Sequence, residues 1–245
     1  MDPLTAAAAS GLRSRIESLD MLANNLANAS TGGFKVDHEF YSTYIGQDSG
    51  DESESSTGQM PVVQKPWTDF SQGTLQETGH PLDVALSGPG FFGLNGSSGP
   101  LYTRNGSFQL SSSGVLTSAD GYPVRLQGGA TLTVKSHAPL QIDRDGQIRQ
   151  SGQLLGRLEI TDFKDTGQLY KVGATNFRAG PGAGAAPATK AQAHQAALES
   201  SNVAVAESAV RLVTLMRHSE GLQKAINVAT QMNQQSIAEI ARVNS

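Results

Sequence analysis

The chain carries one glycine-rich stretch with the spacing of a phosphate-binding loop. Gly88-Pro-Gly-Phe-Phe-Gly93 matches the G-x-G-x-x-G pattern and follows a predicted strand. In a dinucleotide site a helix must come next, because the amides of its first turn hold the pyrophosphate. The next residues, Leu94-Asn-Gly-Ser-Ser-Gly99, do not start a helix. We interpret the stretch as a turn with a buried Phe91 or Phe92, and we expect no cofactor.

The acidic and histidine residues do not follow a metal-ligand pattern. Asp143-Arg-Asp-Gly146 begins like a calcium loop, but Gln147 stands at the fifth ligand position and no glutamate closes the pattern. No two of the five histidines have zinc-ligand spacing: His38, His80, His137, His194 and His218. The sequence therefore predicts turns and no metal site.

Two carboxylates are the nearest candidates for acid–base catalysis. Glu77 and Asp83 flank a predicted turn. Hydrolysis of a glycan needs two carboxyl groups about 5–10 Å apart, one of them with a raised pKa. Neither residue belongs to a catalytic signature, so the leading expectation is that the chain is not an enzyme.

Composition excludes several classes of protein. The 245 residues carry a formal net charge of −4, which gives no reason to expect binding to nucleic acid or an anionic membrane surface. The chain has no cysteine, so a disulfide framework and thiol chemistry are excluded. No apolar run approaches the ~20 residues that span a bilayer. Leu4–Ala9 is too short for the apolar region of a secretion signal, so we expect neither membrane insertion nor a cleaved signal peptide.

An amphipathic helix is predicted over residues 1–30. Asp2 and Pro3 suit the N-cap and the first helical position. Apolar residues then recur at the a/d spacing of a coiled coil: Leu12, Ile16, Leu19, Ala23 and Leu26. A seam this short is marginal alone, since isolated helices below about 12–15 residues barely form in water. It therefore needs a partner.

The turn after this helix must redirect the chain. Asn28, Ser30 and Thr31 compete for backbone hydrogen bonds and end the helix. We expect Gly32 or Gly33 to take a positive φ, which a β-branched residue could not adopt without strain. Phe34 is expected to anchor the bend by burying its ring.

A second, longer helix is predicted at the other end of the chain. Residues 205–242 contain no proline and only one glycine, Gly221, which suits a helix of roughly ten turns. Its seam alternates three and four residues: Leu212, Leu215, Ser219, Leu222, Ile226, Ala229, Asn233, Ser236 and Ile240. We expect the two helices to pair with each other and with helices of neighbouring subunits.

The middle of the chain alternates with the period of β-strands. Residues 67–178 contain short apolar alternations separated by Asn-Gly and Asp-Gly turns such as Asn105-Gly106. The alternations include Leu82-Val84-Leu86, Val124-Leu126, Leu132-Val134 and Leu140-Ile142. This pattern predicts hairpins in an antiparallel all-β domain. Residues 36–66 form a connector whose acidic run, Gly46–Gln59, reads as a solvated loop. Residues 179–194 are rich in glycine, alanine and proline and form a return linker.

Four sequence blocks resemble the bacterial flagellar rod and hook proteins, in the family's order. They are Ala23-Asn-Asn-Leu-Ala-Asn-Ala-Ser-Thr-Gly-Gly-Phe-Lys35, Phe70-Ser-Gln-Gly-Thr-Leu-Gln-Glu-Thr-Gly-His-Pro-Leu-Asp-Val-Ala-Leu86 with Gly88–Phe92, Tyr102-Thr-Arg-Asn-Gly-Ser-Phe108, and Leu198-Glu-Ser-Ser-Asn-Val203. The resemblance implies a structural subunit of the basal-body rod that polymerises helically and transmits torque from motor to hook. Because the chain is short, it is most similar to the proximal rod protein, and the distal rod protein comes second.

The resemblance also implies partners and a location. The partners would be other copies, other rod and hook proteins, and the flagellar export apparatus, which would deliver the chain to the periplasm-spanning rod. The alternative function is a hydrolase of cell-wall glycan or another cell-envelope β-domain protein. The expected fold class is α+β. The terminal helices of segments 1–35 and 195–245 would form a coiled-coil-like rod core, and the antiparallel all-β domain over residues 67–178 would lie outside that core.

Overall fold

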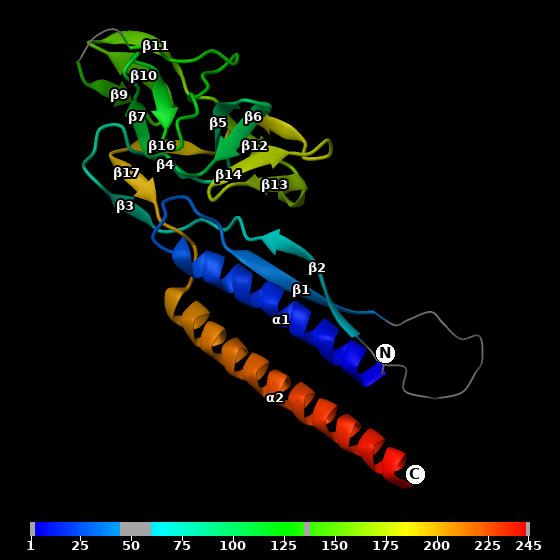
Figure 1. Cartoon of the computed structure of the whole chain (residues 1–245). Helices are drawn as coiled ribbons and strands as arrows, with labels where there is room; N and C mark the ends of the chain where they lie inside the picture. Colours follow the sequence, from blue (N-terminus) through cyan, green and yellow to red (C-terminus); the bar gives the residue numbers. More distant parts are fainter. Residues whose placement is uncertain (1–2, 45–59, 135–137, 244–245) are drawn as a thin grey trace. The chain divides into compact units, whose positions relative to one another are not determined.

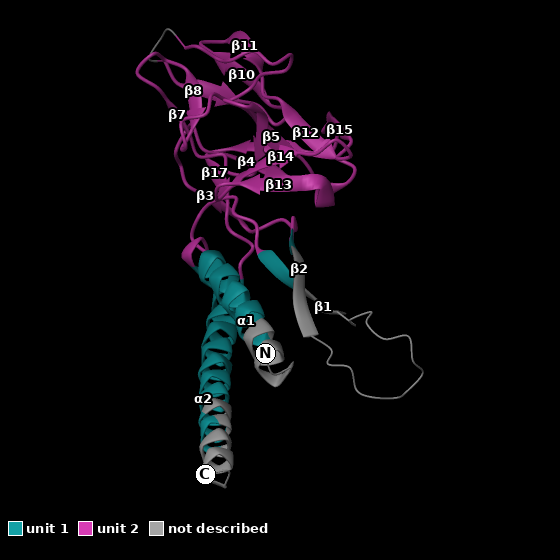
Figure 2. Cartoon of the chain, turned by 45° about the vertical axis from the view of Figure 1, so that its right-hand side comes forward, with its two compact units in different colours: residues 1–26, 37–67, 204–245 teal, residues 27–36, 68–203 magenta. Residues whose placement is uncertain are grey.

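A computed structural model describes residues 3–44, 60–134 and 138–243 (Figure 1). It confirms the α+β class, with two α-helices and mostly antiparallel sheets. The chain divides into two compact units (Figure 2). Unit 1 comprises Met1–Leu26, Asp37–Trp67 and Ala204–Ser245, and unit 2 comprises Ala27–Val36 and Thr68–Val203. The chain therefore passes between the units four times.

Unit 1 contains both helices and a two-stranded sheet. Helix α1 spans Pro3–Ala27 and helix α2 spans Val205–Val243. Strand β1 (Asp37–Tyr44) pairs with β2 (Met60–Thr68). The predicted connector thus contains strands, because aromatic and β-branched residues, which favour strands, stand at both of its ends. The predicted acidic loop lies outside the described residues.

The helix boundaries differ slightly from the expected ones. Helix α1 ends at Ala27, where a turn begins in which the Thr31 amide donates to the Asn28 carbonyl at 3.0 Å. Residues 195–204 precede α2 as extended chain and include strand β17. The helical part of the expected C-terminal segment therefore begins at Val205.

Unit 2 is built from short strands in several small sheets. The largest has the order β13-β14-β6-β5-β12-β15, a second has the order β11-β10-β9, and the pairs β16-β4, β17-β3 and β7-β8 complete the unit. The bounds of these elements are β3 Leu75–Glu77, β4 Val84–Ser87, β5 Phe91–Gly96, β6 Gly99–Thr103, β7 Phe108–Leu110, β8 Leu116–Ser118, β9 Leu140–Ile142, β10 Gln147–Gln150, β11 Gln153–Arg157, β12 Ile160–Phe163, the 3-10 helix η1 Thr166–Gln168, β13 Leu169–Val172, β14 Asn176–Ala179, β15 Ala185–Pro187, β16 Gln192–Gln195 and β17 Ala197–Glu199.

Two apolar clusters fill unit 2, and strand β5 contributes to both. Phe91 and Phe92 are adjacent, so their side chains point to opposite faces of the strand. Phe92 packs edge-to-face on Phe108, with ring centroids 5.1 Å apart, in the larger cluster. The ring centroid of Phe91 lies 6.0 Å from that of Phe177, in the smaller cluster. The glycine-rich stretch 88–93 thus leads into a strand, not a phosphate-binding helix.

Three sequence expectations about the β region need correction. The return linker includes strand β15, which pairs with β12 through backbone groups that small side chains leave accessible. The predicted strands at Val124–Leu126 and Leu132–Val134 form only isolated bridges, because their residues pair with several different neighbours: Val124 with Leu94, Leu126 with Leu158 and Thr133 with Val115. The Asn105-Gly106 turn does not close a hairpin; Ser107 instead forms a bridge with Asp83.

We predict that the larger cluster sets the stability of unit 2. Phe92→Ala removes a fully buried ring and should lower the free energy of unfolding by about 3–5 kcal/mol, the usual range for a buried aromatic. Leu154→Ala is the control, because that side chain is 57% exposed and its loss should cost less than about 0.5 kcal/mol. Denaturant unfolding followed by circular dichroism measures both. Equal losses would show that the core is not where the structure places it.

Candidate functional site

Polar side chains line the buried face of α1. Ser14, Ser18, Leu22 and Asn25 are all buried, and they repeat at the spacing of one helix face. The Asn25 amide nitrogen donates to the Asp37 carbonyl at 2.8 Å, and its oxygen accepts from the Asp37 amide at 3.1 Å. Asn25 thereby fixes the start of β1 against the end of α1.

The predicted apolar seam of α1 lies largely outside this face. Leu12, Leu19 and Leu26 are partly buried, Ala23 is exposed, and Ile16 is 49% exposed. Within a single copy, therefore, much of the seam is available to another molecule.

The predicted seam of α2 is more covered than the rest of that helix. Leu212, Leu215, Leu222 and Ile226 are partly buried, and Ser219 is buried between them. Ala229 and Ile240 fall within α2, but their side chains lie outside the described residues. The Arg15 guanidinium approaches His218 Nδ1 at 3.4 Å, and the Arg211 guanidinium lies 3.7 Å from the Glu39 carboxylate.

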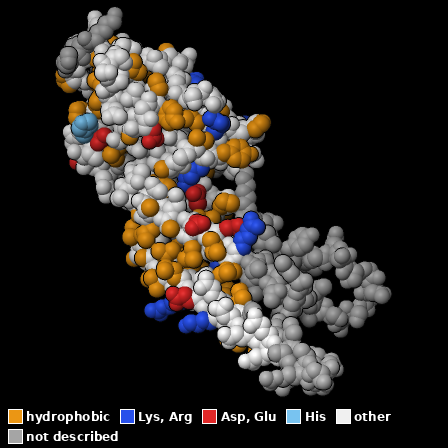
Figure 3. Space-filling view, in the orientation of Figure 1, with side chains coloured by type: hydrophobic (Ala, Val, Ile, Leu, Met, Phe, Trp, Pro, Cys, Tyr) orange, Lys and Arg blue, Asp and Glu red, His pale blue; other side chains and the backbone are white. Residues whose placement is uncertain are grey.

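Helix α2 also presents apolar side chains to solvent. Each of the following is at least 50% exposed: Val205, Val210, Val213, Met216, Val228 and Met232. Figure 3 shows hydrophobic side chains gathered over the helices. Exposed apolar groups in such number are typical of surfaces that bind another protein.

The turn after α1 is held by close backbone packing. Gly33 has φ +68°, and a Cβ placed there would lie 2.3 Å from the Asn105 amide nitrogen. The Gly33 amide also donates to the Glu199 carbonyl at 2.7 Å. Phe34 is fully buried, packs with Val36 and Val203, and has the Lys171 ammonium 4.1 Å above its ring. Gly32 does not take a positive φ.

A buried ionic network lies next to this turn. Glu199 Oε1 accepts from Lys35 Nζ at 2.6 Å and from the Gly73 amide at 2.9 Å. Glu199 Oε2 accepts from Arg104 Nη1 at 3.3 Å. The side chains of Lys35 and Glu199 are fully buried, and that of Arg104 is 5% exposed. We call Lys35, Arg104 and Glu199 the ionic triad.

Burial dominates the electrostatics of the ionic triad. It lowers the pKa of the Lys35 ammonium, and the Glu199 carboxylate opposes that shift. Burial likewise lowers the pKa of the Arg104 guanidinium, again against the effect of Glu199. Both cations also donate to carbonyls: Lys35 Nζ to that of Ser71 at 2.6 Å and Arg104 Nη2 to that of Gly88 at 2.9 Å. Two buried cations thus share the Glu199 carboxylate, and without its charge both would lose this ion-pair partner.

Three of the four chain passages between the units lie next to residues of this region: those after Val36, before Thr68 and after Val203. Ala27–Val36 enters and leaves unit 2, and the chain re-enters at Thr68 and leaves after Val203. Asn202 joins these segments, because its Oδ1 accepts from the Val36 amide at 2.8 Å and its Nδ2 donates to the Asp69 carbonyl at 2.9 Å. We call this network of hydrogen bonds and ion pairs within unit 2 the chain junction.

Sequence reasoning identified the turn but not the residues that hold it. Residue spacing does not point to the ionic triad or to Asn202, although all four residues lie within the motif blocks. The available signal was charge: a lysine in the first block, an arginine in the third and a glutamate in the last. Ion pairs between distant blocks would have been a reasonable hypothesis.

The two candidates for acid–base catalysis, Glu77 and Asp83, either face solvent or make contacts with neighbouring side chains of the β unit. The Asp83 carboxylate accepts from Thr78 Oγ1 at 2.7 Å and lies 3.6 Å from His80 Nδ1, while Glu77 is exposed on β3. Over residues 3–44, 60–134 and 138–243, no group of three or more His, Asp and Glu side chains could hold a metal ion.

Comparison with protein families gives matches along most of the chain. Residues 6–35 match the family described as "Flagella basal body rod protein". Residues 85–150 match "Flagellar hook protein FlgE/F/G D1 domain", and residues 194–239 match "Flagellar basal body rod FlgEFG protein C-terminal". Together these matches define an axial protein of the flagellum.

Individual relatives narrow the class of axial protein to the basal-body rod proteins. The flagellar basal-body rod protein FlgF of Caulobacter vibrioides is 30% identical over 227 residues, covering 92% of this chain and 93% of the relative. FlgG of Buchnera aphidicola (Schizaphis graminum) is 30% identical over 251 residues, covering 91% and 94%. The chain belongs to the flagellar basal-body rod protein family and is a structural subunit of the rod, proximal (FlgF) or distal (FlgG).

We predict that Gly33 cannot carry a β-branched side chain. Gly33→Val should destabilise the chain junction, because the left-handed conformation alone costs a non-glycine residue about 1–2 kcal/mol and the Cβ would overlap the Asn105 backbone. The matched control is Gly32→Ala, whose Cβ would meet its nearest atom at 3.5 Å. Unfolding free energy and incorporation into basal bodies measure the effect. Wild-type values for Gly33→Val would mean that the turn is a passive linker.

Proposed function

We propose that this chain is the proximal rod subunit. Its alignment with FlgF needs few gaps, since 227 positions cover 92% of the 245 residues. The alignment with FlgG from Buchnera needs 251 positions for 91% of the chain, so that relative contains residues that this chain lacks. The absence of those extra residues supports the proximal assignment.

The observation that carries the assembly mechanism is the exposed apolar surface of the helices. Ile16 on α1 and Val210, Val213 and Met216 on α2 are each about half exposed or more in a single copy. Burying one such side chain fully contributes about 1.5–3 kcal/mol. Repeated contacts through several of them would hold neighbouring subunits together.

The helix seams, whose leucines are partly buried within one copy, support a coiled-coil-like arrangement. The seams Leu12–Leu26 and Leu212–Ile226 keep three-four spacing, which is the spacing of helices that pack by inserting side chains between one another. Identical head-to-tail contacts that do not close into a ring generate an open helical assembly. Such an assembly transmits torque because the same contact is repeated along the shaft.

The proposed partners are other copies, other rod and hook proteins, and the flagellar export apparatus. The names of the relatives support the axial partners. Delivery by the export apparatus, without a cleaved signal peptide, follows from the proposed place in the rod. Within the described residues, neither helix is long and apolar enough to cross a membrane. The proposal includes no catalytic step and no contact with nucleic acid, and the family gives no support to a glycan hydrolase.

We predict that a charge in either seam prevents assembly. Leu19→Asp or Leu222→Asp places a carboxylate where apolar contacts are needed, and burying an unpaired charge costs several kcal/mol. Swimming in soft agar and incorporation into basal bodies should be lost, while the β-sheet signal of the purified chain remains.

The matched control for this prediction is Gln223→Asp. It adds the same charge one residue from Leu222, at an exposed position of α2 outside the seam. We expect this variant to swim. Normal swimming of both leucine variants would overturn the helices as the assembly surface.

A further inference from the structure

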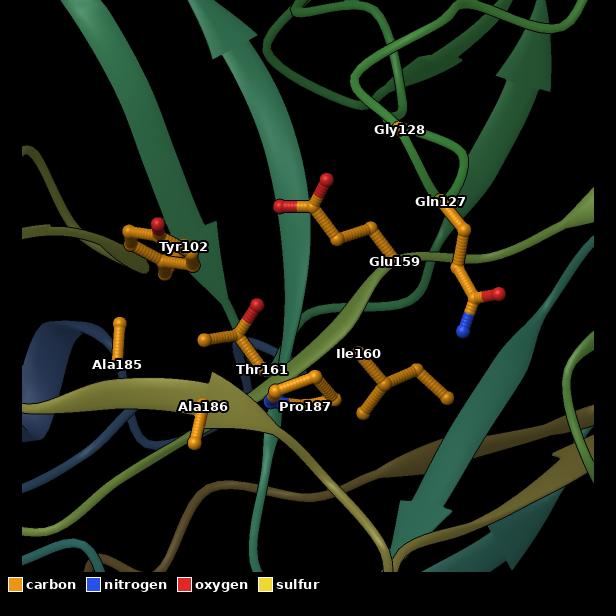
Figure 4. A pocket seen from close by; sticks show the side chains of 9 residues that line it. All are labelled: Tyr102, Gln127, Gly128, Glu159, Ile160, Thr161, Ala185, Ala186 and Pro187. Atoms are coloured by element: carbon orange, nitrogen blue, oxygen red, sulfur yellow. The ribbon is translucent and has the colours of Figure 1, made fainter.

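Unit 2 contains a pocket of about 490 Å³ that the assembly mechanism above does not use. It lies beside strands β6, β12 and β15 and the turn at Gln127 and Gly128 (Figure 4). Its volume falls within the range of about 300–1,000 Å³ that is typical of ligand sites. All its lining residues belong to unit 2.

Small residues create the space. Edge strand β15 contributes Ala185 and Ala186, and the turn contributes Gly128, which takes a positive φ of 87°. Strand β15 pairs with β12 in a register that places Pro187 opposite Thr161. Figure 4 shows the Ala185 side chain pointing toward Tyr102 and Thr161, whereas that of Ala186 points the other way. A larger side chain at the exposed position 185 would therefore fill the pocket.

The one formal charge that lines the pocket is the Glu159 carboxylate. Figure 4 shows it in the middle of the pocket, with the Tyr102 ring on one side and the Gln127 amide on the other. Arg125 Nε donates to its Oε2 at 3.2 Å. Its Oε1 lies over Gly93, where a Cβ would come within 3.0 Å. Gly93 thus leaves the room that the carboxylate occupies, which assigns a purpose to the last glycine of the 88–93 stretch.

The remaining lining is divided between polar and apolar groups. Burial and the Glu159 charge both raise the pKa of the Tyr102 phenol, so the hydroxyl stays protonated and can donate or accept a hydrogen bond. Thr161 adds a second hydroxyl. Ile160 and Pro187 form an apolar wall beside these groups.

This chemistry fits a long cationic side chain. The aliphatic stem of an arginine can lie on Ile160 and Pro187 while its guanidinium donates to a carboxylate and neighbouring oxygens. The Tyr102 ring offers a face for the same cation. An anion would meet the Glu159 charge, and a wholly apolar group would leave that carboxylate without a new partner.

We propose that the Glu159 pocket receives an arginine side chain from a neighbouring polypeptide of the rod. The inference rests on the proposed function, because it requires that the chain be assembled beside other subunits. It adds a contact through the β unit to the contacts through the helices. Glu159 is the residue that would select the partner.

The first test is binding of a minimal probe to the full chain. N-acetyl-arginine amide is titrated into ¹⁵N-labelled protein, and the amide shifts of Gln127, Gly128 and Thr161 are followed. We expect saturable shifts at these residues and at least tenfold weaker binding of N-acetyl-citrulline amide, which keeps the shape but not the charge. No saturable shift, or equal binding of citrulline, overturns the proposal.

Two variants and a control complete the test. Glu159→Gln should weaken arginine binding about tenfold, since charge-assisted hydrogen bonds are roughly twice as strong as neutral ones. Ala185→Leu should abolish binding by filling the pocket while leaving the fold unchanged, since Ala185 is exposed and its side chain points toward Tyr102 and Thr161. Asp143→Asn removes an exposed carboxylate paired with Arg149 and should bind like the wild type. Wild-type binding by both pocket variants would contradict the assignment.

Incorporation into basal bodies separates this inference from the proposed function. Ala185→Leu should reduce incorporation if the pocket contact forms in the rod. If Ala185→Leu is incorporated normally while Leu19→Asp is not, the pocket contact falls and the helix mechanism stands. If Leu19→Asp is incorporated normally, the proposed mechanism itself falls, whatever the probe shows.

Discussion

The rest of the structure depends on one buried carboxylate, that of Glu199. It holds Lys35 from the turn after α1 and Arg104 from the middle of the chain, and it also accepts from the Gly73 amide. Removing one partner of a buried ion pair costs about 3–5 kcal/mol, because the remaining charge stays buried without compensation. Against a typical stability of about 5–15 kcal/mol, that loss is decisive.

The ionic triad explains why the sequence blocks that mark the family lie so far apart. Lys35, Arg104 and Glu199 each belong to a different block, and they meet in the chain junction, next to three of the four passages between the units. Unit 2 supplies its own apolar core. The helices of unit 1 leave apolar side chains exposed. The chain therefore combines a β unit that has its own apolar core with the helices that we propose as the assembly surface.

Local patterns predicted the local structure well. The three-four spacing around Leu19 and Leu222 indicated helices. The prediction that Phe91 or Phe92 is buried holds for both, because both faces of their strand are covered. The prediction of a return linker over residues 179–194 was wrong in part, since β15 pairs through its backbone and its side chains give no strand pattern. The ionic triad could not be derived from spacing, because contacts between residues 35, 104 and 199 depend on the tertiary fold. Nor does an apolar period point to Ser14, Ser18 and Asn25, the polar side chains that line the buried face of α1.

The most direct measurement of the central claim is the unfolding free energy of Glu199→Gln, compared with Asp143→Asn in the same denaturant series. Both substitutions remove one negative charge from an ion pair. The Glu199 pair with Lys35 is fully buried, whereas the Asp143 pair with Arg149 is 40–49% exposed. The account predicts a loss of about 3–5 kcal/mol for Glu199→Gln and at most about 1 kcal/mol for Asp143→Asn. Similar small losses in both variants would contradict it, because the chain junction would then not depend on the Glu199 charge.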